Sequence, residues 1–166
     1  MPKGRLLFTK AGLLELHGAC HDSLGILFAN ASQLPIELLG KHLPGFGFPT
    51  VWEQLAHILK VEEDWILDLQ NKPSNEQQEE DGQGFKALFK KKSSVQRATQ
   101  DYLSSLDEVA LNRTLVERPN RWVGELRSPA FILLHLVTHA FHHKGQVVAM
   151  LRTLGYPTPD TDLQRA

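Results

Sequence analysis

Hydrophobic residues recur at helical spacing along four stretches of the chain, which predicts four long helices. We expect these helices over about residues 10–33, 51–70, 85–109 and 129–154. A further helical turn could follow the first helix from Ile36 to Leu39. The segment 112–128 is ambiguous and could form two short extended pieces. Because no repeat and no second domain are apparent, we expect a single domain over residues 1–166.

Polar residues mark where two of these helices begin. The segment Thr50–Glu53 has the capping-box pattern, in which the threonine oxygen accepts from the backbone and the glutamate reaches back. Ser128 is a good N-cap, and Pro129 fits the first helical position. The helix that they start is apolar around much of its circumference, which predicts burial on several sides.

Two segments of different composition connect the predicted helices. Residues 40–49 are rich in glycine and proline, which resist regular structure. Residues 71–84 contain no apolar side chain larger than proline, which indicates a solvated, mobile loop between the second and third helices. The simplest packing of these elements is an all-α four-helix bundle with a long loop between helices 2 and 3.

Composition and charge narrow the classes of function. The chain has 18 basic and 19 acidic side chains, which gives no basic excess for binding nucleic acid. The one basic run, Lys90 to Lys92, is expected on a solvated helix face. No segment approaches the length of a membrane span, and Cys20 is the single cysteine, so no intrachain disulfide can form. We therefore expect a cytoplasmic protein without nucleic-acid or membrane partners.

Histidine is the candidate chemistry of this chain. His135, His139 and His143 follow each other at four-residue spacing, which places neighbouring members on one helix face. The outer two are about 12 Å apart along the helix axis, so a single ion cannot bind all three. An adjacent pair with a ligand from elsewhere would suit a transition metal, and His57 is the strongest candidate for that third ligand.

Several other residues have both a chemical and a structural interpretation. His17 and His21 form a rival metal pair near the Cys20 thiol, although Cys20 itself is expected to be a small buried residue. Either histidine, or Asn30, could touch a substrate if the first helix borders the pocket. The acidic run Glu62, Glu63 and Asp64 is expected on a solvated face near the helix end.

Two motifs resemble those of the DinB/YfiT-like superfamily of four-helix-bundle proteins. The first is Leu55-Ala-His57-Ile-Leu, followed by Trp65. The second is histidine, three residues, histidine, then basic-Gly-Gln, found here from His139 to Gln146. The resemblance covers the order of all four helices and implies the up-down-down-up arrangement of that superfamily.

The resemblance also implies which residues bind the metal and which others are candidates for the surrounding pocket. The family's three metal-binding histidines correspond to His57, His139 and His143, so His135 becomes a pocket or outer-sphere candidate beside Gln146. The residue after the last ligand is often arginine in the family and is Lys144 here, which keeps the charge without the bidentate fork. His17 is a further pocket candidate, while His142 is less favoured than His143.

Three hypotheses of function follow. The first, which the resemblance favours, is a thiol S-transferase that uses one divalent metal and a low-molecular-weight thiol to modify a small electrophile. The second is a metal-dependent hydrolase, and the third is a protein that binds metal without turnover. Zinc suits three nitrogen ligands, and nickel or iron also fit. A small-molecule substrate is expected, and the apolar last helix favours a homodimer.

Overall fold

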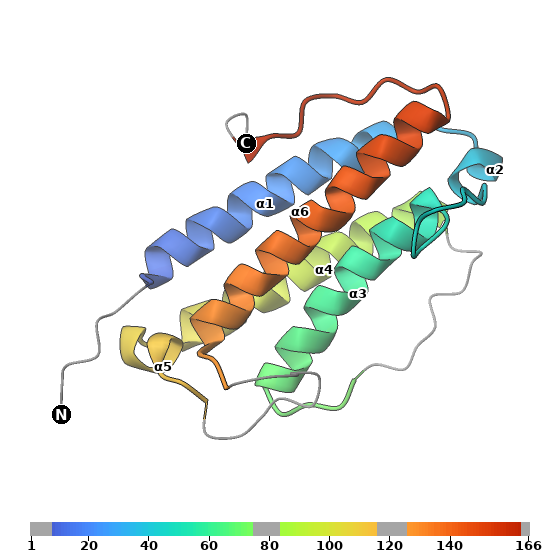
Figure 1. Ribbon diagram of the computed structural model, residues 1–166. Coiled ribbons are helices and arrows are strands. Elements are labelled where there is room, and N and C mark those ends of the chain that lie inside the picture. Colours follow the sequence, from blue (N-terminus) through green and yellow to red (C-terminus); the bar gives the residue numbers. More distant parts are fainter. Residues whose placement is uncertain (1–7, 75–83, 116–125, 164–166) are drawn as a thin grey trace.

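The computed structural model describes residues 8–74, 84–115 and 126–163, and the regular structure in these residues is all helical (Figure 1). The helices are α1 (Lys10–Ala31), α2 (Ile36–Leu39), α3 (Val51–Leu69), α4 (Gly84–Ser105), α5 (Glu108–Asn112) and α6 (Pro129–Thr153). The prediction of an all-α protein is confirmed for these residues.

The two predicted helix starts have the hydrogen bonds that their sequences imply. Thr50 Oγ1 accepts from the backbone nitrogen of Glu53 at 3.0 Å, and Glu53 Oε2 accepts from the backbone nitrogen of Thr50 at 3.0 Å. This reciprocal pair satisfies two amide groups that α3 itself leaves unpaired. Ser128 Oγ likewise accepts from the backbone nitrogen of Phe131 at 3.3 Å at the start of α6.

The third predicted helix is interrupted. We expected it to continue to about residue 109, but α4 ends at Ser105 and the short helix α5 begins at Glu108. Asp107 lies between them in an extended conformation, and its Oδ1 accepts from the backbone nitrogen of Ala110 at 2.6 Å. An aspartate side chain that caps a new helix offers the backbone an alternative to continuing the old one, which explains the break.

The four long helices lie side by side, and each of them contacts two others. Helix α3 packs against α6 and α4, and α1 packs against the same two helices. In Figure 1, α1 and α6 run in one direction, whereas α3 and α4 run in the other. Two groups of buried side chains fill the space between them, and their largest members include Phe28, Leu55, Leu59, Met150, Trp65, Leu103 and Leu133.

Two sequence predictions fall largely outside the described residues. Residues 75–83 of the predicted mobile loop and residues 116–125 of the predicted extended pieces belong to the part that is not described. At the edge of the second segment, the backbone nitrogen of Leu115 donates to the carbonyl oxygen of Arg127 at 3.1 Å. In the described ranges, the helices are all too short or too polar to cross a bilayer.

Candidate metal centre

Three histidines from two helices form a compact group, which we call the triad. His57 lies on α3, and His139 and His143 lie one turn apart on α6. Each offers one ring nitrogen, and these nitrogens lie within 4.8 Å of one another. The ring centroid of His57 is 5.1 Å from that of His139 and 4.6 Å from that of His143. The structure thus brings together the three histidines that were selected from the sequence.

The surroundings of the triad keep its rings uncharged at neutral pH. Burial lowers the pKa of His57, and it lowers the pKa values of His139 and His143 to about 4. The other histidines nearby add to the effect on His139 and His143, because a second positive charge in the group is repelled. Neutral imidazole is the form that donates a lone pair to a metal, so this donor set fits a divalent transition metal.

Gln54 fixes the orientation of one triad ring. Its Nε2 donates to the carbonyl oxygen of Phe48 at 2.9 Å and to Oε1 of Gln146 at 2.6 Å, which directs its Oε1 toward His143. His143 Nδ1 lies 2.6 Å from that oxygen and therefore donates a proton to it. The lone pair of His143 is then on Nε2, in the arrangement that metal-binding histidines commonly have.

Gln54 was missed in the sequence analysis. It precedes His57 by three residues on α3, and residues at this spacing share a helix face. That spacing was a usable signal, because it places Gln54 beside a predicted ligand. The structure then shows that Gln54 is buried, where its amide needs polar partners.

The loop before α3 covers one side of the triad. Phe48 stacks on His57 with the ring centroids 3.9 Å apart and the planes at 27°. Its edge also meets His143, with the centroids 5.9 Å apart. The glycine- and proline-rich segment 40–49 therefore supplies an apolar wall that limits access of water to two of the three rings.

His135 and Gln146 lie at opposite ends of the triad on α6. The ring centroid of His135 is 6.0 Å from that of His139 and 5.9 Å from that of Trp65, one turn before the triad. Gln146 contacts Gln54 and also lies 2.8 Å from Nε2 of the exposed His142. Hydrogen bonds therefore connect His142 at the surface to His143 through the two glutamines.

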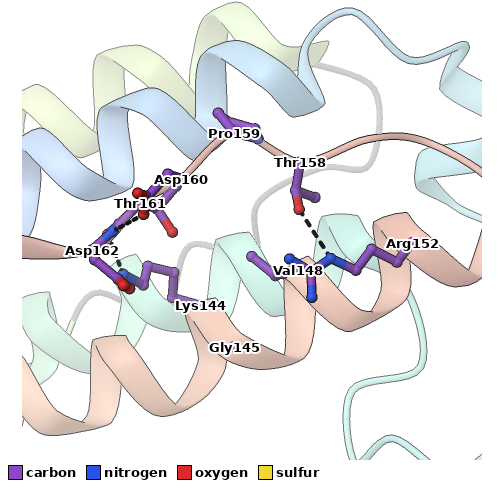
Figure 2. A pocket seen from close by; sticks show the side chains of 9 residues that line it. All are labelled: Lys144, Gly145, Val148, Arg152, Thr158, Pro159, Asp160, Thr161 and Asp162. Atoms are coloured by element: carbon purple, nitrogen blue, oxygen red, sulfur yellow. Dashed lines mark hydrogen bonds between the residues drawn. The ribbon is translucent and has the colours of Figure 1, made fainter. Parts of the chain in front are cut away.

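Lys144 is buried and points away from the triad. Its Nζ donates to Ser23 Oγ at 3.1 Å and to the carbonyl oxygen of Thr161, and it lies 3.9 Å from the ring centroid of Phe141. Figure 2 shows the Lys144 side chain reaching the C-terminal segment, beside Asp162. In this structure the lysine holds that segment against α1 and α6.

His17 belongs to a second group of polar side chains, which we call the buried cluster: His17, His21, Glu62 and Thr99. His17 Nε2 is 2.8 Å from Glu62 Oε1, and His21 Nε2 is 2.9 Å from Glu62 Oε2. Thr99 Oγ1 donates to Glu62 Oε1 at 2.6 Å. These hydrogen bonds hold the Glu62 pKa well below its usual range despite the opposing effect of burial.

The cluster corrects one expectation from the sequence. We expected the acidic run on α3 to face solvent, but Glu62 and Asp64 are only 5% and 6% exposed. Helices α1 and α4 cover Glu62, and Asp64 pairs with Lys60 and accepts from Ser74 Oγ at 2.7 Å. Cys20 is buried as predicted, and its burial raises the thiol pKa to about 12.

Comparison with known proteins gives two results. Residues 26–166 match the DinB family. The chain is 24% identical over 143 residues to "Protein DinB" of Bacillus subtilis (strain 168), and this likeness covers 82% of each chain. The family match contains α3, α6 and the whole triad, but it begins after His17 and His21.

Proposed function

The chain belongs to the DinB family, and on this basis we propose that His57, His139 and His143 bind one divalent transition metal. The observation that carries the proposal is the convergence of three ring nitrogens within 4.8 Å. Their lowered pKa values and the hydrogen bond from His143 to Gln54 leave lone pairs available for coordination. Zinc is the ion proposed first, and nickel and iron also accept three nitrogen ligands.

The activity proposed for this centre is transfer of a small electrophile to a low-molecular-weight thiol. His57, His139 and His143 would hold the ion, and a bound divalent ion would supply Lewis acidity that lowers the pKa of a thiol. In the proposed reaction the thiolate sulfur would form a bond to the electrophilic carbon, the leaving group would depart with its electron pair, and the thiol proton would pass to solvent. Phe48 limits water at the rings, while Gln54 keeps His143 oriented.

Metal content of matched variants tests the centre itself. His139→Ala removes one of the three nitrogens, whereas His135→Ala removes the neighbouring histidine outside the triad. We expect His139→Ala to lose one equivalent of zinc per chain relative to wild type and His135→Ala to keep it, as measured by elemental analysis after desalting. Equal zinc content in wild type and His139→Ala would contradict the proposed centre.

Cobalt-substituted protein tests the thiol. Sulfur ligation to Co²⁺ produces a charge-transfer band in the near ultraviolet, so each common cellular thiol can be added in turn and the spectrum recorded. We expect one of these thiols to produce the band in wild type and none to produce it in His139→Ala. The thiol that binds is then assayed with an activated aryl halide as the electrophile, following the loss of free thiol.

The other two hypotheses make different predictions in the same experiments. A hydrolase would bind the metal, give no sulfur band and release acid from an activated ester. A protein without turnover would bind the metal and show only higher thermal stability in its presence. The homodimer and the cytoplasmic location stay predictions from the sequence.

A further inference from the structure

The buried cluster is a second convergence of metal-ligating atoms. One atom from each of His17, His21 and Glu62 lies within 4.8 Å of the other two, and the residues are 2%, 1% and 5% exposed. The cluster shares no residue with the triad. Glu62 follows His57 by five residues on α3, which places it about 7.5 Å further along the axis and about 140° around it.

Hydrogen bonds satisfy only some of the polar atoms that are buried in the cluster. Nδ1 of His17 and Nδ1 of His21 are buried and have no hydrogen-bond partner among the described residues. The ion pairs described for Glu62 are those with the two histidines, so lysine and arginine contribute none in the described part of the chain. A carboxylate that is buried between two histidines without a lysine or arginine partner is an arrangement that a bound cation would stabilise.

The donor atoms have the composition and arrangement of a metal site. Two histidines and one glutamate form a known ligand set for zinc. His17 and His21 are four residues apart on α1, the same spacing that His139 and His143 have on α6. Thr99 on α4 donates to the Glu62 carboxylate, as hydrogen-bond donors around metal-binding carboxylates commonly do.

We propose that His17, His21 and Glu62 form a second, structural site for a divalent transition metal, with zinc the ion favoured by the donor set. Nitrogen and oxygen ligands of tetrahedral zinc lie about 3.3 Å apart, so the contacts of Glu62 Oε1 with His17 and His21, 2.8 Å and 3.2 Å, would open by up to about half an ångström. Coordination through Nε2 replaces the two hydrogen bonds to Glu62 and leaves the remaining proton of each ring on Nδ1.

The position of this site explains why it would be structural. It joins α1 to α3 with α4 behind it, whereas the triad joins α3 to α6. Its three ligands are almost fully enclosed, which leaves no approach for a substrate.

The number of zinc ions bound per chain tests the second site, first in a variant that leaves this site intact and then in one that changes it. Full-length wild type and His143→Ala are unfolded with chelator, refolded with zinc, desalted and analysed for metal. We expect two zinc ions per chain in wild type and one in His143→Ala, because that variant damages only the triad. We also expect one in Glu62→Gln, which keeps the side-chain shape but lacks the carboxylate charge.

The outcomes separate this proposal from the proposed function. A His143→Ala protein without zinc, or a Glu62→Gln protein with as much zinc as wild type, would overturn the second site. One zinc in wild type that His143→Ala keeps and Glu62→Gln loses would support the second site and contradict the triad. If Glu62→Gln does not fold, the zinc content of His143→Ala decides alone.

Discussion

His139 and His143 each have a pKa of about 4, because burial and neighbouring histidines disfavour the protonated ring. The ordinary histidine pKa is about 6.5, so between these values the unfolded chain binds more protons at the two sites than the folded chain does. The free energy of unfolding of the metal-free protein therefore decreases as the pH falls from about 6.5 toward 4.

Urea unfolding of chelator-treated protein checks this dependence. We expect the unfolding midpoint to decrease from about pH 7.5 to about pH 5, and to decrease less steeply in His143→Gln. Glutamine does not titrate, so the variant lacks the contribution of His143. Circular dichroism reports unfolding at each pH, and equal slopes for the two proteins would show that His143 has no such role.

Gln54 offers a prediction about the orientation of a single ring. Gln54→Leu removes the oxygen that accepts from His143 Nδ1, and loss of such a partner commonly weakens metal binding by about 10- to 100-fold. Competition with a chromophoric chelator measures the affinity of the triad for zinc. Gln54→Glu keeps an acceptor for His143 Nδ1 but loses the two hydrogen bonds that Nε2 donates, so it should bind zinc more tightly than Gln54→Leu. An unchanged affinity in Gln54→Leu would contradict this role.

At the scale of the elements, helix boundaries depend on single polar side chains. Thr50 starts α3 and Ser128 starts α6, as their sequences predict. Asp107 starts α5 and thereby separates it from α4, which the hydrophobic pattern alone did not reveal. The spacing of apolar residues continues across such a break, so only the capping residue distinguishes one helix from two.

The capping box of α3 has a measurable consequence. Thr50→Ala removes the oxygen that accepts from the Glu53 amide and should lower the free energy of unfolding by about 1 kcal/mol. Thr50→Ser keeps the hydroxyl and should be close to wild type. Denaturant unfolding of the three proteins compares them, and an equal loss in the serine variant would assign the effect to the lost methyl group.

At the scale of the whole molecule, Lys144 ties the C-terminal segment to the helices. Thr161 is buried although it lies beyond α6, and its carbonyl oxygen accepts from Lys144 (Figure 2). Ser23 Oγ donates to the same carbonyl oxygen. The amine of Lys144 therefore connects α6, α1 and the end of the described chain. This contact is separate from the triad, because none of the hydrogen bonds described for Lys144 involves a triad histidine.

Replacing Lys144 tests that separation. Lys144→Met should lower the free energy of unfolding by about 1–3 kcal/mol and speed proteolysis of the C-terminal segment, while zinc binding at the triad stays unchanged. Arg152→Met is the control in the same surface pocket, because Arg152 is exposed and its side-chain hydrogen bond within the described part of the chain is the one that it donates to Thr158 Oγ1. It should change stability by no more than about 0.5 kcal/mol. Loss of zinc in Lys144→Met would place the lysine in the metal centre after all.

The sequence by itself determined the features that depend on local geometry. The helical spacing set the His139 and His143 pair on one face, and the polar residues at positions 50 and 128 set two helix starts. His57 was the strongest candidate for the third ligand from the sequence, but its partners on α6 are more than eighty residues away, and choosing His139 and His143 over His135 needed the resemblance to a family.

Only the tertiary structure decided which distant side chains meet. Glu62 reaches His17 and His21 across 45 and 41 residues, and Gln54 reaches His143 across 89. These contacts depend on how α1, α3, α4 and α6 pack, and the apolar pattern of a helix defines which face is buried without naming its neighbour. That is why a glutamate assigned to solvent became the centre of the buried cluster.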